Sequence, residues 1–357
     1  GADVIKIEPP EGDVTRNITA LEKNGVPIGV VSWNRNKRAM VLDLKKPDAA
    51  EVLLRMAERA DVMIQNVRPG VVGRLGIGYE AVSARNPKIV YCSIAGYGFK
   101  GPAVDKPAYD PIIQGWAGVM EAQRTQGRPR AVKNIIADKV TSLTAAISIL
   151  AALNEAQREG RGQHIELAMI DAVAYYLMGD TATNHTFLPH DKGLRPTMGT
   201  LDPFETADGY ITIAPLTDRH WTDILGAVGH PEWFEGDAPR AERVRTTIKN
   251  LIKLFPTMPS AHWLELIENA DVPCGPVNNF DSIWSDPQFL ANETFVEYDH
   301  PKAGRVRAVR QPGRFSASPP ELWRHAPDLG EHTDEILTDF GFSGEEIGEL
   351  RRGEIVR

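Results

Sequence analysis

Short apolar strand-like segments alternate with amphipathic helical segments through the first 175 residues of the chain. This alternation predicts a parallel or mostly parallel sheet with helices on both faces. Ligands of such sheets bind beyond the carboxyl ends of the strands. We therefore expect an α/β protein whose site lies in the segments that follow the strands. The strands are expected at residues 4–7, 39–44, 62–64, 89–94, 132–137 and 164–169, and the helices at residues 47–60, at 139–158 and from 172 onward.

The pattern changes after about residue 180. Residues 181–203 show little periodicity and hold three prolines, which is typical of a connector. The chain is long enough for two domains. We expect a large domain of residues 1–200 and 291–357 and a small α+β domain of residues 201–290. The small domain should hold a hairpin at residues 204–213 that turns at Asp208-Gly209, with helices near 220–228, 241–254 and 261–270; strands near 295–298 and 305–309 and a helix after His332 should follow.

Composition limits the range of functions. The chain of 357 residues is 42% hydrophobic and 25% charged, as in a soluble globular protein, and its apolar runs stay below the roughly 20 residues that span a bilayer. The formal net charge of −8 and the lack of a basic stripe argue against nucleic acid as a partner. The two cysteines, Cys92 and Cys274, form no disulfide framework. We therefore expect a cytoplasmic protein without a nucleic-acid or membrane partner.

Several common site motifs are missing from the sequence. It holds no P-loop, no H-E-x-x-H, no Cys/His cluster and no G-x-S-x-G, so we expect neither a metal site nor a serine hydrolase. Residues 96–101 match G-x-G-x-x-G in part, but Pro102 follows instead of a helix. Residues 331–334 suggest either acid/base chemistry or a helix start with Thr333 as N-cap, and the spacing favours the helix start.

Asp138 stands where the strand-like segment 132–137 meets the helix expected at 139–158. An aspartate at this place can be an N-cap whose carboxylate is held by backbone N–H groups and by the helix dipole. Both effects keep a carboxylate ionised, as a nucleophile must be. A cap without catalytic function is the commoner role, and Asp171 has the same strand-to-helix setting. The local pattern does not choose between the two aspartates.

Motifs spread in order along the chain resemble those of class III CoA-transferases, a family that includes formyl-CoA transferase and carnitine CoA-transferase. The resemblance implies a Rossmann-like large domain made from both ends of the chain, a smaller middle domain and an interlocked homodimer. Family members usually carry a further strand and helix before the segment that begins at Gly1, so these are expected to be missing here. The matching segments are residues 1–8, 36–38, 60–66, 68–70, 96–98, 101–102, 149–153, 162–163, 273–276 and 329–333.

The resemblance implies a site as well as a fold. It places the family's nucleophilic aspartate at Asp138 and leaves Asp171 as a structural residue. The substrates would be an acyl-CoA and a free carboxylic acid, with mixed-anhydride and aspartyl-CoA thioester intermediates and no tightly bound cofactor. Two of the implied CoA contacts, Lys45 and Arg74, suit the nucleotide phosphates. The six implied contacts are Leu42, Lys45, Asn66, Val67, Arg74 and Leu75.

Two departures from family patterns bear on the reaction. The racemase branch carries a histidine where this chain has Tyr109, and a tyrosine with an ordinary pKa near 10 is a poor base at neutral pH. We therefore expect Tyr109 to line the substrate pocket of an acyl-CoA:carboxylate CoA-transferase; the alternatives are a 2-methylacyl-CoA racemase and a non-catalytic acyl-CoA-binding protein. Residues 197–200 stand where formyl-CoA transferase has a glycine-rich lid, which argues against formyl/oxalyl specificity.

Overall fold

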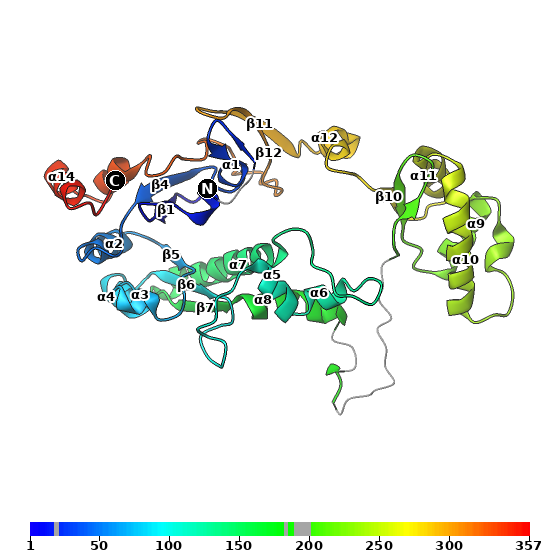
Figure 1. The fold of residues 1–357 in the computed structure, drawn as a ribbon, viewed down its shortest axis with the longest axis horizontal. Helices are drawn as coiled ribbons and strands as arrows, with labels where there is room; N and C mark the ends of the chain where they lie inside the picture. The colour runs from blue at the N-terminus through cyan, green and yellow to red at the C-terminus, as the bar shows by residue number, and fades with distance from the viewer. Residues whose placement is uncertain (18–20, 182–184, 189–200) are drawn as a thin grey trace. The chain divides into compact units, whose positions relative to one another are not determined.

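The structure is a computed structural model that describes residues 1–17, 21–181, 185–188 and 201–357. The chain divides into two compact units (Figure 1). Gly1–Leu194 and Val296–Arg357 form the large unit, and Arg195–Phe295 forms the small unit. Most of the expected connector at 181–203, including the lid position at 197–200, lies outside the described residues.

The large unit contains two parallel sheets, which confirms the predicted α/β class. In the first sheet β1 (Val4–Glu8) pairs with β4 (Lys37–Val41). In the second sheet β6 (Val90–Ala95) lies between β5 (Val62–Gln65) and β7 (His164–Ala168). The first four residues of β6 are at most 3% exposed, as expected for a central parallel strand covered on both faces.

Helices cover both faces of the second sheet. Ala145, Ile149 and Ala152 of the long helix α7 pack against Val90 and Cys92 of β6. Residues of α2 and α4 pack on the opposite face, around Tyr91. A separate core joins β4 to α2, α13 and α14. The helices of the large unit are α1 (Ile28–Trp33), α2 (Ala49–Ala57), α3 (Val71–Arg74), α4 (Tyr79–Arg85), α5 (Asp110–Trp116), α6 (Val119–Ala122), α7 (Ile136–Glu159), α8 (Met169–Thr181), α13 (Thr333–Asp339) and α14 (Gly344–Arg352).

The small unit is α+β, as predicted. Its hairpin, β8 (Phe204–Glu205) and β9 (Tyr210–Ile213), closes where the Thr206 N–H donates to the Gly209 carbonyl, at the predicted turn. β10 (Cys274–Pro276) adds an antiparallel third strand. The small unit also contains α9 (Asp218–Ala227), α10 (Arg240–Leu254), α11 (Ser260–Asn269), α12 (Pro287–Ala291) and short 3-10 turns at 231–234, 255–257 and 282–285. The large unit also contains a 3-10 turn at 14–16 and two antiparallel hairpins, β2 (Glu22–Lys23) with β3 (Val26–Pro27) and β11 (Phe295–His300) with β12 (Gly304–Val309).

Two local predictions were wrong. Residues 131–135 form no strand, and α7 begins at Ile136 with Ile135 as N-cap, so Asp138 lies inside the first turn rather than capping the helix. The segment stays irregular because a side chain binds its backbone: Gln114 accepts from the Val132 N–H and donates to the carbonyls of Val132 and Asn134. The helix predicted after His332 is present, but its N-cap is His332 and not Thr333.

One face of α7 carries an exposed apolar stripe. Leu143, Ile147 and Leu150 are at helical spacing, and their exposed fractions are 67%, 69% and 66%. The buried face carries the smaller side chains of Thr141 and Ala145. By length and hydropathy α7 also qualifies as a membrane-spanning helix, which is weak evidence because core helices pass the same test, and 28% of its most apolar window is buried. The lack of a membrane partner stays a prediction.

Candidate active site

Asp138 is the third residue of α7, and its side chain is half-buried. Burial raises the pKa of its carboxyl above the ordinary value of 3.8, and the neighbouring Asp110 carboxylate raises it further. This corrects the expectation of a cap carboxylate held in its ionised form by backbone N–H groups. Desolvation and like charge act here against ionisation. Among the described residues no hydrogen bond to the Asp138 carboxylate is found.

Asp110, the first residue of α5, supplies the cap that α7 lacks. Its carboxylate is 4% exposed, and Oδ2 accepts from the backbone N–H of Ala137 at 2.7 Å and of Asp138 at 3.1 Å. The first N–H groups of a helix have no partner within the helix, so a carboxylate there satisfies them and stabilises the positive end of the dipole. Asp110 therefore fixes the backbone of Asp138 from a different helix.

Gln114 completes this clamp one turn later on α5. It is 1% exposed and donates through Nε2 to Asp110 Oδ1 at 2.6 Å. The same amide group holds the backbone at Val132 and Asn134, so α5 secures the chain on both sides of the α7 start. The sequence analysis missed Asp110 and Gln114 as site residues. Their spacing of four on one helix face was the available signal.

Tyr109 is the N-cap residue of α5 and directly precedes Asp110. Its side chain is 74% exposed, so it is accessible to a substrate. The end of β6 positions this segment by close packing: a Cβ at Gly96 would lie 2.3 Å from the Cβ of Ala108, so only glycine fits there. Gly96 of the partial G-x-G-x-x-G thus makes room for the chain that carries Tyr109.

Asp171 has a plainer environment than Asp138. It is the third residue of α8, which begins at Met169 and not at Ala172 as expected, and its side chain is exposed. Tyr109 is the chain neighbour of Asp110, whose carboxylate accepts from the Asp138 N–H, and Asp171 lies on another helix.

Two of the predicted CoA contacts follow β4. Lys45 has an 83% exposed side chain, and its ammonium group lies 3.8 Å from a carboxylate oxygen of Glu11. Leu42 is 1% exposed and forms a bridge with Val356, so its side chain belongs to the core and does not face a ligand. The Lys45 side chain is therefore accessible to a ligand, whereas the Leu42 side chain is not.

The other four predicted contacts lie on the segment that runs from the end of β5 through α3. Asn66, Val67 and Arg74 are exposed, and Leu75 is half-buried. Gly70 turns the segment with a φ of 78°, a left-handed conformation that suits glycine. These residues therefore lie on one segment at the surface of the large unit.

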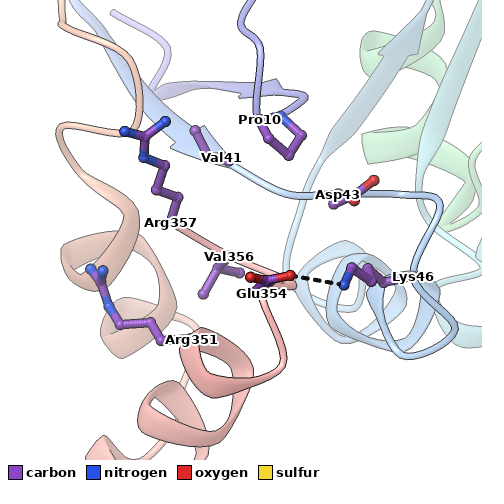
Figure 2. Close-up of a pocket in the computed structure, with 8 residues that line it drawn as sticks. All are labelled: Pro10, Val41, Asp43, Lys46, Arg351, Glu354, Val356 and Arg357. Atoms are coloured by element: carbon purple, nitrogen blue, oxygen red, sulfur yellow. Dashed lines mark hydrogen bonds and ion pairs between the residues drawn. The ribbon is translucent and has the colours of Figure 1, made fainter.

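A cleft of about 470 Å³ lies beside the loop after β4 (Figure 2). An ion pair of 3.4 Å between Lys46 and Glu354 crosses it. It contains none of the predicted site residues, and its acidic and basic side chains nearly balance, so we assign no ligand to it. Its lining residues are Pro10, Val41, Asp43, Lys46, Arg351, Glu354, Val356 and Arg357.

A metal site finds no support in the described part of the chain, where no group of three or more His, Cys, Asp or Glu side chains is placed to hold an ion. The expectation that the protein has no metal site stays a prediction. Both cysteines are free thiols, and burial raises the pKa of Cys92 and of Cys274. Neither thiol is therefore a better candidate nucleophile than Asp138.

Comparison with known proteins assigns the family. The model of CoA-transferase family III matches residues 1–333. Succinate–glutarate CoA-transferase of Agrobacterium fabrum is 30% identical over 95% of this chain and 89% of its own length. Formyl-CoA:oxalate CoA-transferase of a Bradyrhizobium species is 31% identical over 98% and 90%. The crystal structure of a CAIB/BAIF family protein from Brucella suis superimposes with a TM-score of 0.80 and 29% identity, covering 95% of this chain and 92% of that one. The chain therefore belongs to CoA-transferase family III and is an enzyme of that class.

Proposed function

We propose that this enzyme moves CoA from an acyl-CoA to a free carboxylic acid, with Asp138 as the nucleophile. The observation that carries the proposal is the half-buried Asp138 carboxyl at the start of α7, whose backbone is fixed by Asp110. The similar proteins named as transferases between two acids support it. Once ionised, a carboxylate with a raised pKa is more basic and hence a stronger nucleophile.

The first half of the reaction loads CoA onto the enzyme. The Asp138 carboxylate attacks the thioester carbonyl of the donor and expels CoA thiolate, which leaves a mixed anhydride of Asp138 and the donor acid. The thiolate then attacks the aspartyl carbonyl of the anhydride. This forms an aspartyl-CoA thioester on Asp138 and releases the donor acid as its carboxylate.

The second half reverses these steps with the acceptor. The acceptor carboxylate attacks the aspartyl thioester, which expels CoA thiolate and forms a second anhydride. The thiolate attacks the acceptor's acyl carbonyl, which gives the new acyl-CoA and regenerates the Asp138 carboxylate. Covalent catalysis of this kind splits one difficult transfer into easier steps, and the two substrates supply every group that moves, so no tightly bound cofactor is required. The half-buried position of Asp138 limits the access of water to both intermediates.

The substrates would be held by the segments that follow β4 and β5. In this proposal Lys45 and Arg74 bind the phosphates of CoA, and Asn66, Val67 and Leu75 contact its nucleotide. Leu42 supports the Lys45 loop from the core, since its side chain is buried. Tyr109 lines the acyl pocket next to Asp110 and Asp138. The names of the similar proteins include succinate, glutarate and oxalate, so short dicarboxylic acids are the first acceptors to test.

We also propose that two copies of the chain form a homodimer in the cytoplasm. The apolar stripe of Leu143, Ile147 and Leu150 on α7 is two-thirds exposed, and exposed apolar patches commonly mark protein interfaces. A second copy presents the same stripe. The free thiols of Cys92 and Cys274 suit a reducing compartment.

One experiment separates this function from its alternatives. The enzyme is incubated in D2O with a panel of acyl-CoA donors and free acids, and the products are read by mass spectrometry. CoA on the added acid, without deuterium at the α-carbon, is the expected result. Deuterium entering a 2-methylacyl-CoA without exchange of CoA would indicate a racemase. If the protein binds CoA esters but converts none of them, it is a non-catalytic acyl-CoA-binding protein.

A further inference from the structure

Three polar side chains form a hydrogen-bonded chain across the second parallel sheet. Gln65 of β5 donates through Nε2 to Ser93 Oγ at 2.8 Å, and Ser93 Oγ lies 2.9 Å from His164 Nε2 of β7. Gln65 is the direct partner of Ser93 in the ladder, and His164 is the partner of Tyr91, so all of these side chains share one face of the sheet. Ser93 is only 3% exposed.

The direction of the Gln65 bond follows from its outer end. Gln65 Oε1 accepts from the Val67 N–H at 2.9 Å, so its Nε2 must face Ser93 and donate. Ser93 Oγ accepts this bond and is also hydrogen-bonded to His164 Nε2, where the tautomer of the imidazole sets which atom donates. The chain therefore runs from the imidazole to the backbone of Val67, the second residue after β5.

Aromatic contacts hold the same imidazole on its other side. The ring of His164 stacks on Tyr79, with centroids 4.9 Å apart and planes within 16°. Tyr91 meets the imidazole edge-on at 5.4 Å and donates from its hydroxyl to the Ile77 carbonyl at 2.9 Å. Both tyrosines thus connect His164 to residues 77–79.

We propose that His164 is a positioning residue that fixes both ends of the segment 66–78. The N-terminal end is fixed through Ser93, Gln65 and the Val67 N–H, and the C-terminal end through Tyr79 and Tyr91. This segment carries four of the five proposed CoA contacts, so the inference rests on the proposed function. A CoA site that is already ordered binds more tightly because less conformational entropy is lost on binding.

Ser93 and His164 resemble a nucleophile and its base in their separation, but their surroundings exclude that role. Ser93 is 3% exposed within a central strand, so no substrate carbonyl reaches its hydroxyl. Its oxygen already accepts from Gln65, and Tyr79 covers a face of the imidazole. The pair therefore serves to hold the segment and not to attack a substrate.

The test compares two variants that interrupt the hydrogen-bonded series Gln65–Ser93–His164 at different places. Ser93→Ala removes the central hydroxyl, and His164→Phe keeps a flat ring against Tyr79 but loses the nitrogen that is hydrogen-bonded to Ser93. We expect each variant to bind free CoA about tenfold more weakly in calorimetry, as for the loss of one buried hydrogen bond. The kcat should stay within about twofold of wild type. The double variant should bind no more weakly than the weaker single variant, because both changes break one chain.

Hydrogen exchange supplies a readout that a general loss of stability would not reproduce. In both variants, peptides that span residues 66–78 should exchange faster, while peptides of α7 and β6 keep their wild-type rates. Glu166→Gln is the matched control, since Glu166 is the exposed residue two positions after His164 on the same face of β7. It should leave CoA affinity and exchange unchanged.

The outcomes separate this inference from the proposed function. If Ser93→Ala and His164→Phe bind CoA as tightly as the wild-type enzyme does, the inference is overturned and the proposed function is unaffected. Faster exchange throughout the large unit would also overturn it, since that indicates a structural role alone. A wild-type enzyme that binds no CoA would overturn the proposed function itself. If Ser93→Ala fails to fold, Gln65→Ala at the half-buried end of the chain carries the same test.

Discussion

The Asp110 carboxylate accepts a hydrogen bond of 3.1 Å from the backbone N–H of Asp138, the proposed nucleophile. The same carboxylate is one of the two causes that raise the pKa of the Asp138 carboxyl, after burial. One buried acid thus fixes the backbone of Asp138 and makes its side chain a stronger base. The two effects predict different consequences for substitutions at the two positions.

Replacing Asp138 by alanine removes the proposed nucleophile without removing a structural contact found among the described residues. We expect Asp138→Ala to lower the rate of CoA transfer at least about a thousandfold, as the loss of a covalent nucleophile does. The thermal unfolding midpoint should stay close to that of wild type. Asp171→Ala is the matched control, because Asp171 lies in the first turn of another helix and is exposed. Normal transfer by Asp138→Ala would exclude it as the nucleophile.

Replacing Asp110 by asparagine removes the negative charge next to Asp138. The nucleophile must be ionised, so kcat/KM should fall on the acid side at a pH above the ordinary aspartate value of 3.8, because the pKa of Asp138 is raised. In Asp110→Asn this acid limb should move to lower pH, since a like charge no longer opposes ionisation. The measurement is the pH dependence of kcat/KM in both proteins.

A second variant separates charge from position at this site. Gln114→Ala breaks the clamp on Val132 and Asn134 but leaves the Asp110 charge in place. We expect it to lower the free energy of unfolding by about 1–3 kcal/mol, because buried backbone groups lose their partner. Its acid limb should stay where wild type has it. An acid limb that moves equally in Gln114→Ala and Asp110→Asn would argue against an electrostatic cause.

His332 should make the fold sensitive to acid. It is 7% exposed, and its Nδ1 accepts from the Ala39 N–H at 3.3 Å, which joins α13 to β4. Burial lowers the pKa of His332 below its ordinary value of 6.5, so the unfolded chain takes up a proton before the folded one does. The free energy of unfolding should therefore decrease as pH falls from about 6.5 toward the lowered value, and should not depend on this group at higher pH. Urea unfolding of wild type and His332→Asn across this range measures the effect, and a stability that rises on acidification in wild type alone would contradict it.

The parts of the fold that depend on local periodicity were predictable from the sequence. The apolar runs at residues 62–64 and 89–94 became β5 and β6, and the helix expected at 139–158 is α7. The strand expected at 132–137 failed because its backbone partner, Gln114, lies 18 residues earlier on another helix. The link between Ser93 and His164 spans 71 residues and depends on strand register. Neither contact produces a periodic pattern in the sequence, so neither was predictable from it.

The apolar stripe on the surface of α7 is a further feature whose partner the sequence does not predict. The spacing of Leu143, Ile147 and Leu150 correctly marks an apolar stripe, but a single sequence does not say whether the stripe is covered by the same chain or by another. Within one chain it is about two-thirds exposed, so we expect a second copy to cover it. Ile147→Asp places a charge in the centre of this stripe and should convert the dimer to monomers, because burying an unpaired carboxylate is costly.

Analytical ultracentrifugation of wild type and Ile147→Asp measures this effect. Ile252→Asp is the matched control, since Ile252 is a 56% exposed isoleucine on α10 of the small unit and the chemical change is the same. The control should remain dimeric. A dimer that persists in Ile147→Asp would mean that another surface holds the two copies together. A wild-type chain that is monomeric and sediments with lipid vesicles would instead assign the α7 stripe to a membrane.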